Sequence, residues 1–371
     1  MRFDSVRVYQ DSLLSKGIAG NDCAVFIRGE CVYRHFSGWA DMEKKIAIGQ
    51  DTIYQMYSMT KPVTCAAALK LVEQGKMCLS DPVAEYLPEF AEMTVRQPDG
   101  ALRPAKNAIR LLDLFRMTAG ICYDLQAEPL MQLAQTKPDY TTRDYASAIA
   151  QMPLAFEPGT RWLYGLCHDV LAAVTEVVSG KPFSMFLRET VFQPLDMREA
   201  FFHVPENLLT RMARKYVFEQ NCPPQKKLSL DILFQQGKHE SGGAGLHCTV
   251  DEYAKFAVAL CAGDETLLQP ETVALMRENQ LPTFAARADF RTFKPHAHGY
   301  GLGVYTVDEE DEEGPFGWGG AAGTYVVMDP RFDLVIVTAY QAEPNPSDLV
   351  RPEMLTRIYR ALGLGERPYY A

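Results

Sequence analysis

Ser58 and Lys61 form the strongest chemical signal in the sequence, an S-x-x-K pattern. On a helix, side chains at positions i and i+3 share a face, so the lysine amine can reach the serine hydroxyl. The apolar neighbours Tyr57, Met59 and Val63 predict that the amine is buried, and burial favours the neutral amine, which can act as a base. Because the pattern is common by chance, a serine capping a helix beside an exposed lysine is the alternative.

Tyr164 is the second candidate, in the segment PGTRWLYGLCHDVLAAV, where a turn at Pro158-Gly159 leads into a predicted helix. A phenol is normally too weakly acidic to serve as a base. A neighbouring lysine ammonium favours its anion, so Tyr164 could exchange a proton with Ser58. A tyrosine packed in the core is the alternative.

A glycine-rich segment, GWGGAAG at 317–323, comes directly before the apolar run TYVVMDP. Glycines that enter a strand let the backbone approach a ligand closely and direct an N–H group at an oxyanion. No helix follows, so the segment is not a dinucleotide fingerprint, and GYGLG at 299–303 is excluded because it lies inside a strand pattern. The order and spacing of the three signals together predict an acyl-transfer site.

The elements around Ser58 follow from the same patterns. Residues 24–28 and 31–36 are β-like runs separated by Gly29-Glu30, which predicts a hairpin, and 53–57 is a third short run. After Ser58, KPVTCAAALKLVEQGKM has apolar positions at helical spacing up to Gly75. We therefore expect Ser58 to open a buried helix.

The rest of the chain divides by pattern. Residues 80–239 favour helix and loop, strand character returns in GYGLGVYTV, TYVVMDP and DLVIVTAY, and LVRPEMLTRIYRALG favours a helix. This predicts an α/β (α+β) fold in which an antiparallel sheet flanked by helices is built from 1–79 and 240–371, with a mainly helical domain of 80–239 inserted. The active site would lie in the cleft between them. The acidic run at 308–313 favours a solvated hairpin loop.

Composition narrows the function classes. The chain has 371 residues, 47% of them hydrophobic, and a net charge of -10, which argues against a nucleic-acid partner. It lacks an apolar signal run of about 7 to 15 residues and a span of roughly 18, so we expect a cytoplasmic protein without membrane attachment. Nine cysteines without a C-x-x-C pair predict reduced thiols. His296 and His298 lack a suitably spaced carboxylate, and we expect no metal and no organic cofactor.

These segments together resemble the serine β-lactamase and penicillin-binding protein family, which carries S-x-x-K at its nucleophile. The similarity extends through IRLLDLFRMTAGI, FEPGTRWLYG, SGGAGLHCTVDEYAKF and YGLGV. It implies a β-lactamase/transpeptidase-like fold, Ser58 as the acylated nucleophile, Lys61 as its partner and Tyr164 as the tyrosine of the second motif. It also implies an oxyanion hole made by the backbone N–H groups of Ser58 and Ala321.

Two positions depart from the β-lactamase pattern. The second motif reads Tyr164-Gly165-Leu166 without its usual Asn, and Trp318 stands where β-lactamases carry Lys or His. Trp318 cannot hold a β-lactam carboxylate electrostatically, but it can pack against an apolar acyl or alcohol group. The chain is in this respect similar to the β-lactamase-like carboxylesterases and related acyltransferases with a W-G-G third motif, which implies that Trp318, Gly319 and Gly320 bind substrate.

Two further residues are implied by the same resemblance. Asp169, five positions after the tyrosine, either replaces the missing Asn by bonding to Lys61 or lies exposed on a helix. Tyr123 forms a pocket wall or packs in the core.

The sequence thus predicts a serine hydrolase that forms an acyl-enzyme on a small-molecule ester or amide, most simply a carboxylesterase for small or medium acyl esters. A β-lactamase or D-amino-acid peptidase is one alternative, although Leu166 and Trp318 count against it. An acyltransferase and a non-catalytic β-lactam- or ligand-binding protein are the others.

Overall fold

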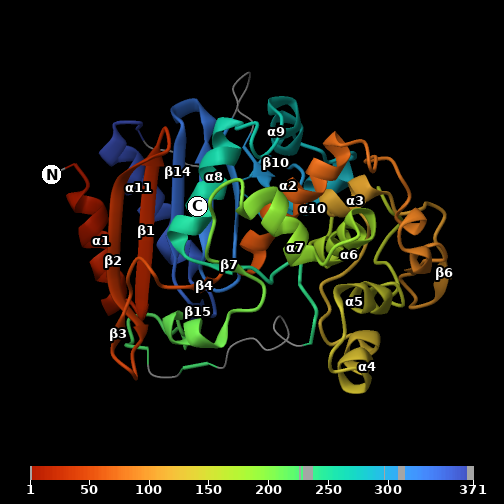
Figure 1. Ribbon diagram of the computed structural model, residues 1–371, viewed down its shortest axis with the longest axis horizontal. Helices are drawn as coiled ribbons and strands as arrows, with labels where there is room; N and C mark the ends of the chain where they lie inside the picture. The colour runs from red at the N-terminus through yellow and green to blue at the C-terminus, as the bar shows by residue number, and fades with distance from the viewer. Residues whose placement is uncertain (1, 225–226, 229–236, 296, 308–313, 366–371) are drawn as a thin grey trace.

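The computed structural model describes residues 2–224, 227–228, 237–295, 297–307 and 314–365, and its main layer is an eight-stranded sheet (Figure 1). All neighbouring strands run antiparallel. In spatial order the strands are β10 (Gly299–Tyr300), β11 (Tyr305–Thr306), β12 (Phe316–Gly319), β13 (Tyr325–Asp329), β14 (Leu334–Ala339), β1 (Gly20–Ile27), β2 (Glu30–Asp41) and β3 (Ile46–Ala47).

The two ends of the chain meet in the middle of this sheet. Strand β1 pairs with β14, from Asp22 opposite Ala339 to Ile27 opposite Leu334, and Figure 1 shows these early and late strands side by side. Strand β14, with the sequence LVIVTA, is buried throughout rather than alternating, because both faces of the sheet are covered. The predicted fold class is confirmed, whereas the domain boundaries at 79/80 and 239/240 stay predictions.

Helices cover the sheet and form the rest of the molecule. Helix α8 packs on β1, β13 and β14, while α1 and α11 pack together on the opposite face (Figure 1). Helix α6 packs against α2, α3 and α5 beside the sheet. The helices are α1 (Asp4–Ser15), α2 (Thr60–Glu73), α3 (Leu111–Phe115), α4 (Glu128–Thr136), α5 (Thr142–Ile149), α6 (Cys167–Ser179), α7 (Phe183–Leu187), α8 (Val250–Ala262), α9 (Pro270–Arg277), α10 (Phe284–Phe293) and α11 (Ser347–Leu362).

Helix α2 is the central helix. Eleven of its 14 residues are buried. The helix is therefore buried on all sides instead of presenting one buried stripe and one solvent-exposed face. Its position between the sheet and α6 explains this, because each face meets protein. The predicted helix after Ser58 is confirmed, and the chain turns at Gly75, which has a left-handed φ of 65°.

Three small sheets complete the fold. A three-stranded sheet joins β4 (Tyr54–Gln55), β9 (His247–Cys248) and β7 (Ala200–Phe201), and two-stranded ones join β5 (Thr94–Arg96) with β6 (Leu102–Pro104) and β15 (Ala342–Glu343) with β8 (Tyr216–Val217). The apolar run at 53–57 therefore contributes only the short β4, and it does so outside the main sheet.

Two local predictions were wrong or incomplete. Residues 299–307 do not form one strand, because Gly303 has a φ of 85° and the chain folds back so that β10 pairs with β11. Helix α1 was not expected, since its charged residues interrupt the apolar pattern, yet Val6 and Leu13 are buried. The acidic run at 308–313 lies outside the described residues.

No single helix of the described chain is long and apolar enough to cross a membrane, although the bent pair Cys167–Ser179 and Phe183–Phe192 passes that test by length and composition. All nine cysteines are unpaired, as expected from their spacing.

Asp113 organises the turn that leads toward the second motif. Its buried carboxylate accepts hydrogen bonds from the Thr118 hydroxyl (2.7 Å), the Arg116 guanidinium (3.0 Å) and the Arg110 backbone N–H (3.1 Å). Met117 has a left-handed φ of 61°, and its carbonyl accepts the N–H of Leu163, next to Tyr164. The carboxylate thus braces the turn at 110–118, and the Met117 carbonyl of that turn binds the segment before Tyr164.

We predict that Asp113→Ala lowers the free energy of unfolding by about 2–4 kcal/mol, because the buried Thr118 hydroxyl and two partly buried donors lose their acceptor. Urea denaturation measures this change. The matched variant Asp139→Ala, at an exposed position, should stay within about 0.5 kcal/mol of the parent protein. Equal stability of the two variants would contradict this role.

Candidate active site

Ser58 lies in a tight 3-10 turn, Tyr57–Met59, between β4 and α2. Tyr57 has a φ of 49°, a left-handed conformation that is uncommon for a bulky residue and that clusters at functional sites. The Thr60 hydroxyl holds this turn by donating to the Tyr57 carbonyl at 2.6 Å and accepting the Leu246 N–H at 3.0 Å. The serine is thereby fixed at the start of the buried helix.

Three predicted side chains meet at one oxygen. The Tyr164 hydroxyl donates to Ser58 Oγ at 2.6 Å, and Lys61 Nζ donates to the same Oγ at 3.3 Å. Lys61 Nζ also lies 4.6 Å from the centroid of the Tyr164 ring. The phenol and the amine are therefore each within hydrogen-bond distance of the serine hydroxyl, from which a proton can be exchanged.

The Lys61 amine is enclosed by protein. The residue is fully buried, and its Nζ donates to the Gly243 carbonyl at 2.7 Å. The ring of Tyr123 lies 5.5 Å from Nζ, which adds a cation–π contact. Burial of the lysine, as expected from the sequence, is observed.

Asp169 is buried but does not bond to Lys61, so both expectations for this residue were wrong. Its Oδ1 accepts the Ser241 hydroxyl at 2.5 Å and the Gly243 N–H at 3.3 Å. Burial raises the pKa of this carboxyl, and the Ser241 bond and the Lys61 charge oppose that rise. Asp169 acts on Lys61 through the loop that supplies the lysine's carbonyl partner.

The loop SGGAG at 241–245 supplies the carbonyl that accepts from Lys61, a role that the sequence did not predict. The Thr64 hydroxyl of α2 donates to the Gly242 carbonyl at 2.7 Å. A Cβ on Gly243 would lie 2.6 Å from Asp169 Oδ2, and one on Gly242 would lie 2.3 Å from the His168 carbonyl. The paired glycines let this loop fit between α2 and α6.

An aromatic cluster surrounds Tyr164. Tyr123 stacks on it with 5.5 Å between ring centroids and 5° between planes, and Phe293 stacks at 5.1 Å. Trp318 Nε1 donates to the Tyr164 hydroxyl at 3.4 Å. Tyr123 thus supports Tyr164 from behind, while Trp318 and Phe293 line the cavity.

The glycine-rich segment lies against the nucleophile turn. The Thr324 hydroxyl donates to the Met56 carbonyl at 2.9 Å, and a Cβ on Gly320 would lie 2.5 Å from that carbonyl. The Gly320 N–H donates to the Thr324 carbonyl. The N–H of the exposed Ala321, by contrast, donates to no group in the described residues. Ala321 and Ser58 line the same cavity, so this N–H can reach a substrate oxygen.

This cavity has a volume of about 340 Å³. Its walls combine aromatic rings with two cationic side chains. Sequence reasoning missed the lining residues at and after the end of α10, on β13, and in and just before α11. The missed lining residues are Phe293, Lys294, Pro295, Tyr325, Asn345, Ser347, Asp348 and Arg351.

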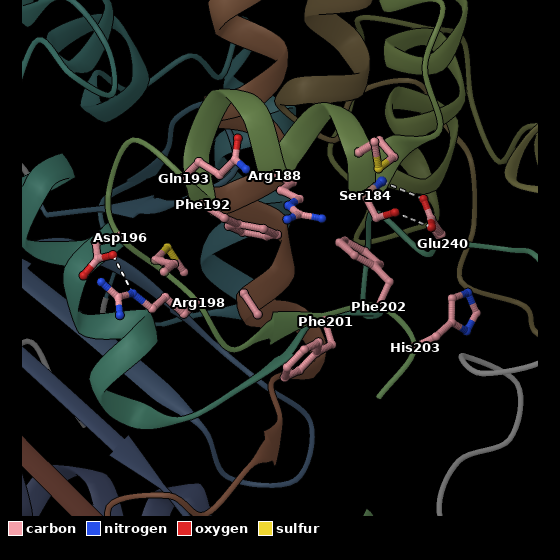
Figure 2. A pocket seen from close by; sticks show the side chains of 13 residues that line it. Ser184, Arg188, Phe192, Gln193, Asp196, Arg198, Phe201, Phe202, His203 and Glu240 are labelled. Atoms are coloured by element: carbon pink, nitrogen blue, oxygen red, sulfur yellow. Dashed lines mark hydrogen bonds and ion pairs between the residues drawn. The ribbon is translucent and has the colours of Figure 1, made fainter. Parts of the chain in front are cut away.

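A second cavity of about 590 Å³ lies beside α7 (Figure 2). Its serine, Ser184, donates to the Glu240 carboxylate at 2.5 Å, as the dashed lines in Figure 2 show. No lysine, and no tyrosine, lines this cavity within the described residues. It therefore does not reproduce the arrangement around Ser58.

Among the residues that the structure describes, no group of three or more His, Cys, Asp or Glu side chains could hold a metal ion. His296 lies outside those residues.

Comparison with known proteins assigns nearly the whole chain to one family. The Beta-lactamase family profile matches residues 7–359. The chain belongs to the Beta-lactamase family. This member is 30% identical over 369 residues to Protein Rv1367c of Mycobacterium tuberculosis, covering 88% of this chain and 90% of that protein. It is 28% identical over 375 residues to Esterase EstB of Burkholderia gladioli, covering 91% of each.

A solved structure agrees with this assignment. EstCE1, a hydrolase with promiscuous acyltransferase activity, matches this Beta-lactamase family member with a TM-score of 0.79 and 26% identity over 98% of each chain. The predicted family and fold are confirmed, and the comparisons support an enzyme of the serine hydrolase and acyltransferase group.

We predict that Asp169→Leu lowers kcat by about a hundredfold, because a displaced Gly243 carbonyl misplaces Lys61. Asp169→Asn keeps an acceptor for Ser241 and should retain much more activity. Steady-state kinetics with an activated ester and thermal melting of both variants measure this. Equal kcat losses in the two variants, or losses that follow stability alone, would contradict a positioning role.

Proposed function

We propose that this protein is a serine carboxylesterase that cleaves small or medium acyl esters through an acyl-enzyme on Ser58. The observation that carries the proposal is the convergence of Tyr164 and Lys61 on Ser58 Oγ, at 2.6 and 3.3 Å, beside a cavity. A nucleophile with two adjacent proton-transfer groups is the arrangement that covalent acyl transfer requires.

Acylation begins when Ser58 Oγ attacks the ester carbonyl carbon and the Lys61–Tyr164 pair takes the serine proton. The carbonyl oxygen becomes an oxyanion, which the N–H groups of Ser58 and Ala321 stabilise. When the tetrahedral intermediate collapses, the bond to the alkoxy oxygen breaks. Tyr164 returns the proton to the leaving alcohol.

Deacylation repeats these steps with water. Tyr164 and Lys61 accept a proton from the attacking water, the same N–H groups hold the second oxyanion, and the proton returns to Ser58 as the acid leaves. Ester and water are thereby converted into acid and alcohol, with no other reactant.

The walls of the cavity favour an ester over a β-lactam. Trp318 and Phe293 present rings, which suit an apolar acyl or alcohol group. Leu166, in place of the usual Asn, is buried and offers no hydrogen bond. The similarity to Esterase EstB supports the same choice.

We predict that Ser58→Ala, Lys61→Met and Tyr164→Phe each lower the kcat for 4-nitrophenyl butyrate by about a thousandfold or more. Each variant removes either the nucleophile or one of the two proton-transfer groups, and the three act together. A fluorophosphonate probe followed by peptide mass spectrometry should label Ser58 in the parent protein. Ser184→Ala, which changes the serine of the other cavity, is the control and should keep both turnover and labelling.

Two results would overturn this function. Rapid nitrocefin turnover without ester cleavage would identify a β-lactamase instead. An unlabelled Ser58, together with unchanged properties of Ser58→Ala, would indicate a binding protein.

Acyl transfer to an alcohol is a second candidate function, favoured by the similarity to EstCE1, a hydrolase with promiscuous acyltransferase activity. The acyl-enzyme would then pass its acyl group to an alcohol that takes the place of water. We predict that 1-butanol added to the ester reaction yields the butyl ester in proportion to its concentration, as gas chromatography can measure. Exclusive formation of the free acid would exclude this function.

A further inference from the structure

Two cationic side chains line the catalytic cavity. Lys294 follows the end of α10 and Arg351 lies in α11, and both line the cavity together with Ser58. Among the described residues, no carboxylate lies within ion-pair distance of either side chain. Asp348, also on the lining, is exposed to solvent, which screens its charge.

The Arg351 guanidinium packs against the glycine strand that flanks the nucleophile. Its Cζ lies 4.3 Å from the centroid of the Tyr325 ring. A Cβ on Gly319 would lie 2.9 Å from its Nη2, so the absence of a side chain there admits the guanidinium. Its Nη2 donates a long hydrogen bond, 3.5 Å, to the Thr324 carbonyl, and its buried Nε has no hydrogen-bond partner among the described residues.

Lys294 reaches the same ring from another direction. Its Nζ lies 5.8 Å from the centroid of Tyr325 and 4.8 Å from that of Tyr305. Burial, and then the charge of Arg351, lower its pKa to about 7. Two like charges beside each other, with unused donors, leave electrostatic and hydrogen-bonding capacity for an anion.

We propose that the natural substrate is an acidic ester, whose free carboxylate binds Lys294 and Arg351 while its ester carbonyl lies at Ser58. This inference rests on the proposed esterase function and names its substrate class. The aromatic walls at Trp318 and Phe293 would contact the apolar part of such a molecule. A guanidinium and an ammonium can each donate to carboxylate oxygens, which gives the site its selectivity.

The test uses matched pairs of esters that differ only in charge. One pair carries the carboxylate on the acyl side: the 4-nitrophenyl half-ester of glutaric acid and its methyl ester. The other carries it on the alcohol side: 3-carboxyphenyl butyrate and its methyl ester. The parent protein should show a lower KM for the acidic member of at least one pair.

The variants Lys294→Met and Arg351→Met should raise the KM of the preferred acidic ester about tenfold or more, as loss of a charged hydrogen bond does. The KM of its neutral partner should change much less. Arg351→Lys keeps the positive charge and should retain most of the preference, which separates charge from folding effects. Lys76→Met removes the same charge at an exposed position after the end of α2, away from the cavity lining, and is the matched control.

The pH dependence gives a second readout. Lys294 is charged below its pKa of about 7, so the KM of the acidic ester should rise between about pH 6 and about pH 9 relative to that of its neutral partner. The groups that face Lys294 are Arg351 and Asp348 of α11, Tyr305 of β11 and Tyr325 of β13. Lys294→Arg keeps its charge throughout this range and should abolish the rise.

Failure of this inference differs from failure of the esterase function. If Ser58 cleaves the neutral esters, but neither pair shows an acidic preference and the variants change nothing, the carboxylate site is wrong and the esterase stands. If neither kind of ester is cleaved and Ser58 stays unlabelled, both are wrong.

Discussion

The buried amine of Lys61 is the constraint on which the site depends. A polar group in the protein interior must be hydrogen-bonded, and this amine donates to the Gly243 carbonyl and to Ser58 Oγ. The Gly243 loop is in turn held by Asp169 and by Thr64, on the two helices that enclose the lysine. Stability and reactivity therefore share one network, because the bonds that make burial tolerable also aim the amine at the nucleophile.

A second constraint is at the Met56 carbonyl, where the main sheet contacts the turn that carries Ser58. The Thr324 hydroxyl donates to it, which fixes the glycine-rich turn after β12 beside the nucleophile turn. Tyr57, the residue between Met56 and Ser58, is held at a positive φ. The serine, the Ala321 N–H and the cationic side of the cavity are thus positioned by contacts between segments far apart in the chain.

Short-range patterns were enough to predict part of this arrangement. Ser58 and Lys61 are spaced to share a helix face, and glycines before an apolar strand permit a close backbone approach, so the position of these residues at one site could be inferred from the sequence. The partner of Asp169 could not, because it depends on how the loop at 241–245 packs between helices. Lys294 and Arg351 carried no signal, since separate helices bring them to Tyr325 only in the folded chain.

The most direct test of the central claim is to trap the acyl-enzyme itself. The protein is mixed with a slowly turned-over ester, quenched in acid within the first turnover, and analysed by intact mass and peptide mapping. We predict a mass increase equal to the acyl group, located on the peptide that contains Ser58 and lost in Ser58→Ala. An acyl group on another residue such as Ser184, or ester turnover in Ser58→Ala at the parent rate, would contradict it.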